Sequence, residues 1–243
     1  MLALLQKEIA GFFSSLTGYV AIVVFLLVSG LFLWVFPGNL NIPDSGIASM
    51  GPLFDIAPWI FLFLVPAITM RSIAEEKKAG TMDLLLTRPL TILQIVLMKY
   101  AAAVVLILLS LLPVLVYYLS VAALGDPRGN IDHGAFWGSF IGLLLLASCY
   151  ASIGILASAL TENTIVAFLL AVFLSFILYA GFGYLAMLFP LGGAGSLIQS
   201  LGIDAHYQSI SRGVIDSRDM LYFFSVIAVF ILIADTKLTY QYR

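Results

Sequence analysis

The chain has 243 residues, of which 62% are hydrophobic and only 10% are charged. Soluble domains carry about 25% charged residues, so this composition excludes a soluble fold and indicates an integral membrane protein. A net charge of -2 gives no sign of a nucleic-acid partner or of a polybasic surface, and the single cysteine, Cys149, excludes an internal disulfide.

The first 16 residues predict an amphipathic helix that lies flat in the membrane interface. On a helical wheel, its apolar side holds Leu2, Leu5, Ile9, Phe12, Phe13 and Leu16, and its polar side holds Lys7, Glu8, Gly11, Ser14 and Ser15. The alternative is that this segment is only the start of the first membrane span.

Six stretches are long and apolar enough to cross a bilayer, which requires about 20 residues. They are residues 18–36, 52–70, 90–124, 131–160, 164–189 and 219–236. The third is expected to kink at Pro113. The fourth has small residues four apart, such as Gly138 and Gly142 or Gly154 and Ser158, a spacing that lets helices approach closely. We therefore expect an all-α membrane protein of one domain, residues 1–243, with the fourth span in its interior.

Charge is concentrated between the second and third spans, in residues 71–89, which we call the elbow. Seven charged residues lie in this stretch and Lys99 follows it. Capping-box spacings begin at Ser72 and again at Thr91, and Gly80 is suited to the left-handed backbone that ends a helix. The pattern predicts a compact pair of short helices on the membrane surface, shaped for contact with another protein.

Residues 190–218 predict an extracytoplasmic segment between the fifth and sixth spans, with Ser217 as the cap of the last helix. Its polar residues are candidates for a lid at the exit of a transport path: His206, Tyr207, Arg212, Asp216 and Asp219. The alternative is a plain solvated connection.

Six spans place both termini on the same side of the membrane as the elbow. That side holds eight basic residues, and the opposite side holds three. The first group is Lys7, Arg71, Lys77, Lys78, Arg88, Lys99, Lys237 and Arg243, and the second is Arg128, Arg212 and Arg218. The positive-inside rule therefore predicts that the elbow and both termini are cytoplasmic.

The sequence lacks the groups that carriers and ATPases use. No charged residue falls near the centre of a predicted span, where ion-coupled carriers place ionisable groups. There is no glycine-lysine loop for phosphates, and His133 and His206 have no neighbours at metal-ligand spacing. We expect no catalytic residue, metal or cofactor in this chain, so energy for any transport would come from a partner.

The stretch from Met70 to Pro89, with Lys99 beyond it, resembles the cytoplasmic loop of ABC-2 type transporter permeases. In that family an acidic residue, a Gly-Thr pair, a leucine pair and a proline precede a long third span. Four further runs resemble the gliding-motility-associated permeases of Bacteroidetes-type bacteria: Phe32-Leu33-Trp34-Val35-Phe36, Ala57-Pro58-Trp59-Ile60, Gly129-Asn130-Ile131-Asp132 and Ser211-Arg212-Gly213-Val214-Ile215-Asp216.

This resemblance implies a six-span half-transporter of the bacterial inner membrane. It would pair with a second permease or with a second copy of itself, and with a cytoplasmic ATPase that binds ATP and Mg. The elbow would be the coupling helix that contacts the ATPase. Its implied contact residues are Glu75, Glu76, Lys77, Lys78, Gly80, Thr81, Asp83, Leu84, Leu85, Leu86, Arg88 and Pro89.

Three functions stay open at this point. The leading one is the membrane subunit of an ATP-driven exporter. The second is a subunit that transmits ATP-driven motion to an extracytoplasmic machine without moving a substrate. The third, an ion-coupled carrier, is disfavoured because the spans lack charged residues at their centres.

Overall fold

The structure is a computed structural model that describes residues 2–87, 89–189 and 193–242, and over these residues it contains only helices and their connections. The predicted all-α class is therefore confirmed. The helices are α1 (Leu2–Ser14), α2 (Leu16–Trp34), α3 (Ile42–Ser45), α4 (Gly51–Thr69), α5 (Ala74–Lys78), α6 (Thr81–Leu86), α7 (Ile92–Leu111), α8 (Val114–Leu124), α9 (His133–Leu160), α10 (Thr164–Phe176), the π-helical turn η1 (Ile177–Gly181), α11 (Phe182–Met187), α12 (Gly193–Gln199), α13 (Ile203–Ile210) and α14 (Ser217–Tyr242). The start of the predicted outer segment, residues 190–192, and Arg243 lie outside the described residues.

Five helical stretches of the described chain are long and apolar enough to cross a membrane. They are Gly51–Lys78, Ile92–Leu124, His133–Leu160, Thr164–Met187 and Ser217–Tyr242. Helices α1 and α2 meet the same requirement together, with a bend of 67° between them. The number of candidate spans is therefore five, or six when the bent pair is included, and the six predicted spans correspond to the larger number.

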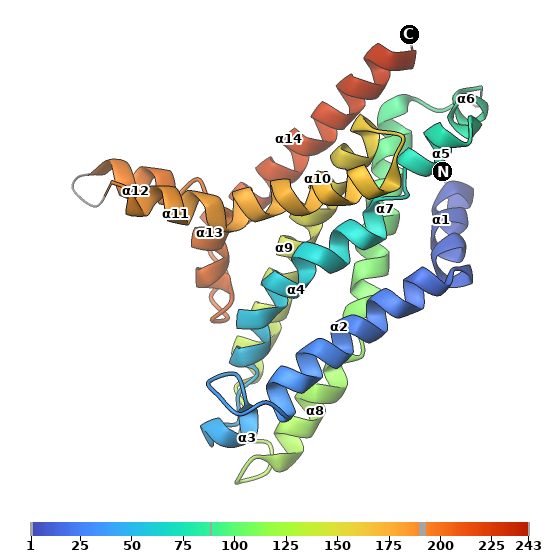
Figure 1. Ribbon diagram of the computed structural model, residues 1–243. Helices are drawn as coiled ribbons and strands as arrows, with labels where there is room; N and C mark the ends of the chain where they lie inside the picture. The colour runs from blue at the N-terminus through green and yellow to red at the C-terminus, as the bar shows by residue number, and fades with distance from the viewer. Residues whose placement is uncertain (1, 88, 190–192, 243) are drawn as a thin grey trace.

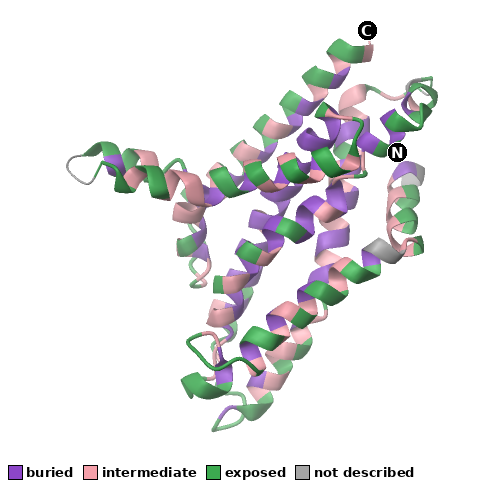
Figure 2. Ribbon diagram, viewed as in Figure 1, coloured by how far each residue is buried: buried purple, intermediate pink, exposed green. Residues whose placement is uncertain are grey.

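Helix α9 is the centre of the molecule, and α4, α7, α10 and α14 pack around it (Figure 1). It is buried along most of its length, whereas α10 and α14 expose much of their surface (Figure 2). A β-carbon added at Gly142 would lie 2.2 Å from Ile210 Cγ2, and one at Gly154 would lie 2.0 Å from Thr69 Oγ1. The predicted interior position of the fourth span is confirmed, because Ile210 and Thr69 pack so closely against its glycines that a larger side chain would clash with them.

Two of the long helical stretches change geometry partway along. Helix α7 ends at Leu111 and α8 begins at Val114, so the regular helix is interrupted at Pro113, and the kink expected there stays a prediction. Helix α10 continues through the π-helical turn η1 into α11. Single π turns within α-helices are frequent at functional sites, which directs attention to the side chains that η1 carries.

One predicted cap is present and another is displaced by one residue. The capping box is formed because Thr91 Oγ1 accepts a hydrogen bond from Gln94 N, and Gln94 Oε1 accepts one from Thr91 N. The prediction that Ser217 caps the last helix is wrong. Ser217 is the first residue of α14, and Asp216 Oδ1 accepts the hydrogen bond from Arg218 N at 2.9 Å. A carboxylate is an equally good cap and its charge suits the helix dipole.

The described ends of the chain lie at the same end of the bundle as α5 and α6, which we call the elbow end (Figure 1). The opposite end, the outer end, holds α3, α12 and α13 together with the first turns of α9 and α14. The two ends differ in how their polar residues are used.

Candidate functional site

The elbow is a pair of short helices, α5 and α6, joined by a tight turn. Gly80 has a φ of +66° at this turn, the left-handed conformation that favours glycine, as the sequence predicts. Ile73 and Met82 point inward and are almost completely buried, at 0% and 1% exposure. The elbow is therefore packed onto the bundle and is not a loose loop.

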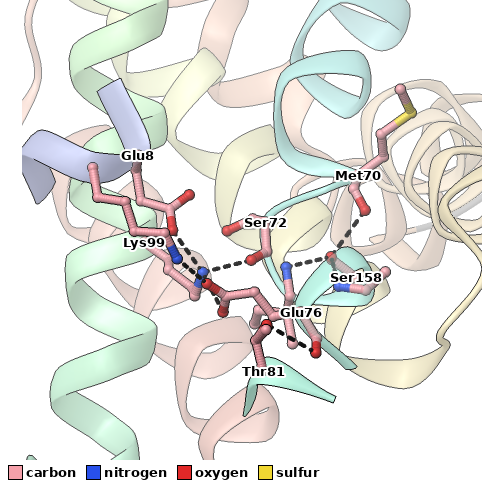
Figure 3. A network of polar contacts seen from close by, with 10 residues as sticks. Glu8, Met70, Ser72, Glu76, Thr81, Lys99 and Ser158 are labelled. Carbon is pink, nitrogen blue, oxygen red and sulfur yellow. Dashed lines mark hydrogen bonds and ion pairs between the residues drawn. The ribbon is translucent and has the colours of Figure 1, made fainter. Parts of the chain in front are cut away.

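The turn between α4 and α5 is held by one hydroxyl from α9. Ser158 Oγ accepts hydrogen bonds from the backbone N–H groups of Ile73 and Ala74, each at 2.9 Å, and donates one to Met70 O at 3.0 Å (Figure 3). The predicted capping box of Ser72 and Glu75 is wrong, because Ser72 Oγ is buried without a hydrogen-bond partner among the described residues. The cap of α5 thus comes from a residue far away in the sequence.

A buried ammonium group joins the elbow to α1 and α7. The side chain of Lys99 is 0% exposed, and its Nζ lies 2.8 Å from Glu8 Oε1, 2.7 Å from Glu76 Oε2 and 2.6 Å from Ser72 O (Figure 3). Lys7 Nζ lies 2.9 Å from the other carboxylate oxygen of Glu76. Glu8 Oε1 and Ser72 O accept hydrogen bonds from Lys99 Nζ, and Glu76 Oε2 adds an ion pair without a hydrogen bond. These contacts offset part of the cost of burying the lysine charge.

A second buried lysine joins the elbow to α9 and α14. Lys77 Nζ donates to Ala159 O at 2.5 Å and to Gln241 Oε1 at 2.7 Å. Ala159 belongs to the last turn of α9, where backbone carbonyls lack intrahelical partners and attract cations. Through Lys77 and Lys99 together, the elbow is tied to four other helices.

These contacts divide the predicted coupling residues into two groups. Glu76 and Lys77 face the bundle, each with 8% exposure, and Leu85 is half-buried against the core. The outward group is Glu75, Lys78, Gly80, Thr81, Asp83, Leu84 and Pro89, all exposed. Leu84 is the most prominent apolar member, with 66% of its surface exposed. Arg88 and the side chain of Leu86 lie outside the part of the chain that the structure describes.

Sequence reasoning missed the residues that hold the elbow from elsewhere. The sequence places Lys7 and Glu8 on the polar side of an interface helix and Ser158 in close helix packing, and it predicts no contact of these residues with the elbow. Gln241 was not singled out. One available signal was that Lys99 stands inside a strongly apolar stretch, where a charged group requires a partner. The identity of that partner could not be read from the sequence because Glu8 is 91 residues away.

The outer segment contains one paired histidine. His206 Nδ1 lies 2.7 Å from Asp219 Oδ1, and its Nε2 lies 2.9 Å from Ser200 O. The imidazole ring stacks on Tyr222 with a centroid distance of 3.8 Å. His206 and Asp219 thus join α13 to the first turn of α14.

The other three lid candidates lie apart from this pair. Tyr207 OH donates to Phe54 O at 2.9 Å, and burial raises the pKa of this hydroxyl well above its ordinary value, so it stays a donor. Asp216 caps α14, and Arg212 is exposed. The five residues therefore do not form one cluster, although Tyr207 fixes α13 to α4.

Comparison with known proteins assigns the chain to a family. The model of the ABC-2 family transporter proteins matches residues 13–234, so the chain belongs to the ABC-2 family of transporter membrane proteins. It is the membrane permease component of such a transporter and is not itself an enzyme. Permeases of this family pair with an ABC ATPase, which binds the ATP. A search of curated proteins found no match to the chain.

Proposed function

We propose that this chain is the membrane subunit of an ABC exporter and that its elbow is the coupling segment for the ATPase. The observation that carries this proposal is the two-sided elbow. One side is fixed to the bundle by Lys77, Lys99 and Ser158, and the other presents charged side chains around the exposed Leu84. The exposed side can contact a partner protein, and the fixed side can pass the partner's motion to the bundle.

The anchoring contacts define the path of that motion. Ser158 and Lys77 connect the elbow to α9 and α14, and Lys99 connects it to α1 and α7. Removing one partner of a buried ion pair costs about 3–5 kcal/mol, so these contacts are strong enough to carry a displacement of the elbow to the helices. Glu76 and Lys77 act in this proposal as anchors, and Glu75, Lys78, Thr81, Asp83 and Leu84 as contacts to the ATPase.

The proposal places the elbow and both termini in the cytoplasm of a bacterial cell and the chain in its inner membrane. The excess of basic residues on the elbow side supports this orientation. The shared position of both described ends and the elbow is consistent with it (Figure 1).

The resemblance to gliding-motility permeases extends the proposal to a particular system. The chain resembles the permease GldF in the four runs given above. We therefore propose a GldA-like cytoplasmic ATPase and a GldG-like second permease as its partners, in a heterodimeric transporter. A homodimer of this chain is the alternative arrangement.

The test is co-purification of the native complex from cells that express an affinity-tagged chain. Leu84→Asp places a charge at the centre of the outward face and is expected to release the ATPase, while the chain stays in the membrane. Tyr240→Asp is the matched control, because Tyr240 is 88% exposed near the same end but outside the elbow. Retention of the ATPase by Leu84→Asp, or its equal loss in the control, would overturn the coupling assignment.

A further inference from the structure

The outer end contains a cavity of about 940 Å³ that the coupling proposal does not use. It is open to the surface on one side and is lined by residues of α4, α9, η1, α11 and α13. Pockets for small molecules typically have volumes of about 300–1,000 Å³, so this one has room for a sizeable ligand. A second, smaller hollow of about 400 Å³ lies at the elbow end beside Lys99.

The described lining of the outer cavity is acidic. It includes three aspartates, Asp55, Asp132 and Asp204, and one basic residue, Arg212. The positive charge of Arg212 interacts with the carboxylate of Asp55. Asp132 and Asp204 then have no basic residue among the described lining residues to offset their negative charge. A recess lined by one sign of charge concentrates ions of the opposite sign, so the cavity favours cations and disfavours anions.

The same cavity has an aromatic wall. Trp59 and Tyr179 meet edge to face with ring centroids 5.5 Å apart, and Tyr184 and Phe136 line the cavity beside them. Aromatic faces attract cations, most strongly when the cation is organic and weakly hydrated. Asp204 also lines the cavity and acts electrostatically on Tyr179, so a carboxylate lies close to the aromatic wall.

A metal ion does not fit this arrangement. Over the residues that the structure describes, no three His, Cys, Asp or Glu side chains come close enough to hold one. Hard metal ions require several oxygen ligands at short distance, whereas the aspartates here are spread around a large space. The spread of the aspartates around the cavity suits a bulky cation, whose charged group and apolar groups contact different parts of the wall.

One buried polar atom next to the aromatic wall is unsatisfied. Tyr150 is 0% exposed, and its hydroxyl has no hydrogen-bond partner among the described residues. Its ring lies edge to face with Tyr179 at a centroid distance of 6.3 Å, and it is within electrostatic reach of Asp204 and Tyr207. An unpaired buried hydroxyl is costly, so its presence behind the aromatic wall requires a physical explanation.

We propose that the outer cavity binds an amphipathic organic cation, such as an amine or a quaternary ammonium group with an apolar substituent. Asp204 supplies the opposing charge, and the aromatic rings of Trp59 and Tyr179 contact the cationic group of the ligand. The π-helical turn η1 positions Tyr179 for this contact. The site is at the opposite end from the elbow, so its existence does not depend on the coupling proposal.

The test is ligand binding to the purified full-length chain in lipid nanodiscs. The probes are tetraphenylphosphonium and tetraphenylborate, which have nearly the same size and shape but opposite charge. We expect saturable binding of the cation alone. Asp204→Asn should weaken it roughly tenfold through loss of a close opposite charge, and Trp59→Leu about fivefold through loss of the cation–π contact.

Two variants outside the cavity are matched controls. Asp126→Asn removes an exposed carboxylate and Trp137→Leu an exposed indole, neither of which lines the cavity, so binding should not change. If Asp204→Asn does not fold, Asp132→Asn tests the same charge requirement, because asparagine can still cap α9 at that position. Equal binding of the two probes, absence of cation binding, or equal effects of the cavity and control variants would overturn the proposal. Leu84→Asp should leave binding intact, which separates this test from that of the ATPase contact.

The cationic group could belong to a lipid headgroup or to a free amine. Competition with dihexanoylphosphatidylethanolamine and with phenethylamine distinguishes these sources. Displacement of the bound phosphonium by the lipid alone would identify a headgroup, and displacement by the amine alone would identify a soluble ligand. Failure of both to compete would contradict the assignment to organic ammonium compounds.

Discussion

The elbow end and the outer end of this permease both contain charged residues, but they use them differently. At the elbow end, Lys99 and Lys77 are withdrawn from solvent and joined to partners on distant helices. At the outer end, Asp55 and Arg212 are exposed and line an open cavity. Buried charge therefore holds elements of this protein together, whereas exposed charge around a hollow is available to a ligand.

The largest expected effect concerns the buried lysine at the elbow end. Lys99→Met leaves the carboxylates of Glu8 and Glu76 without their main partner and should destabilise the chain by about 3–5 kcal/mol. Arg212→Met, the outer-end counterpart, should cost less than about 0.5 kcal/mol because Arg212 is exposed. Thermal unfolding of both purified variants in the same detergent measures the difference, and equal losses of stability would show that the buried lysine contributes no more than the exposed arginine.

The same site offers a second measurement. Adding Glu8→Gln and Glu76→Gln to Lys99→Met removes the unpaired charges, so part of the lost stability should return. No recovery would mean that Lys99 contributes through packing and not through its ion pairs.

A smaller effect is expected at the hydroxyl that caps α5. Ser158→Ala leaves the N–H groups of Ile73 and Ala74 unpaired and should cost about 2 kcal/mol. It should also lower the ATPase turnover of the assembled complex, because the elbow is no longer fixed to α9. Ser152→Ala is the control, since within the described part of the chain Ser152 Oγ bonds only to Cys149 O of its own helix. The proposed transmission path would be contradicted if both variants had the same turnover.

The smallest effect tests the cap at the outer end. Asp216→Ala should destabilise α14 by about 1 kcal/mol, because its carboxylate accepts the hydrogen bond from Arg218 N. Ser217→Ala should change little, because its hydroxyl is not the cap. Hydrogen exchange of the first-turn amides of α14 would report the change, and faster exchange in Ser217→Ala alone would favour the original prediction.

Much of the fold followed from local pattern. Apolar runs of membrane length, the interruption of the helix at Pro113 and the Thr91 capping box depend on residues close in the chain, so the sequence was sufficient to predict them. The interior position of α9 followed from its small residues for the same reason. The family resemblance of the elbow also rests on a contiguous stretch.

The order of the residues was enough to identify an all-helical membrane protein of the ABC-2 type with a charged elbow between its second and third spans. The packing of the helices was needed to show which elbow residues face inward, that Ser158 caps α5 and that Glu8 meets Lys99. Hydrophobic periodicity and capping are local properties of the backbone, whereas a buried charge is satisfied by whichever partner the packing of distant helices brings within reach.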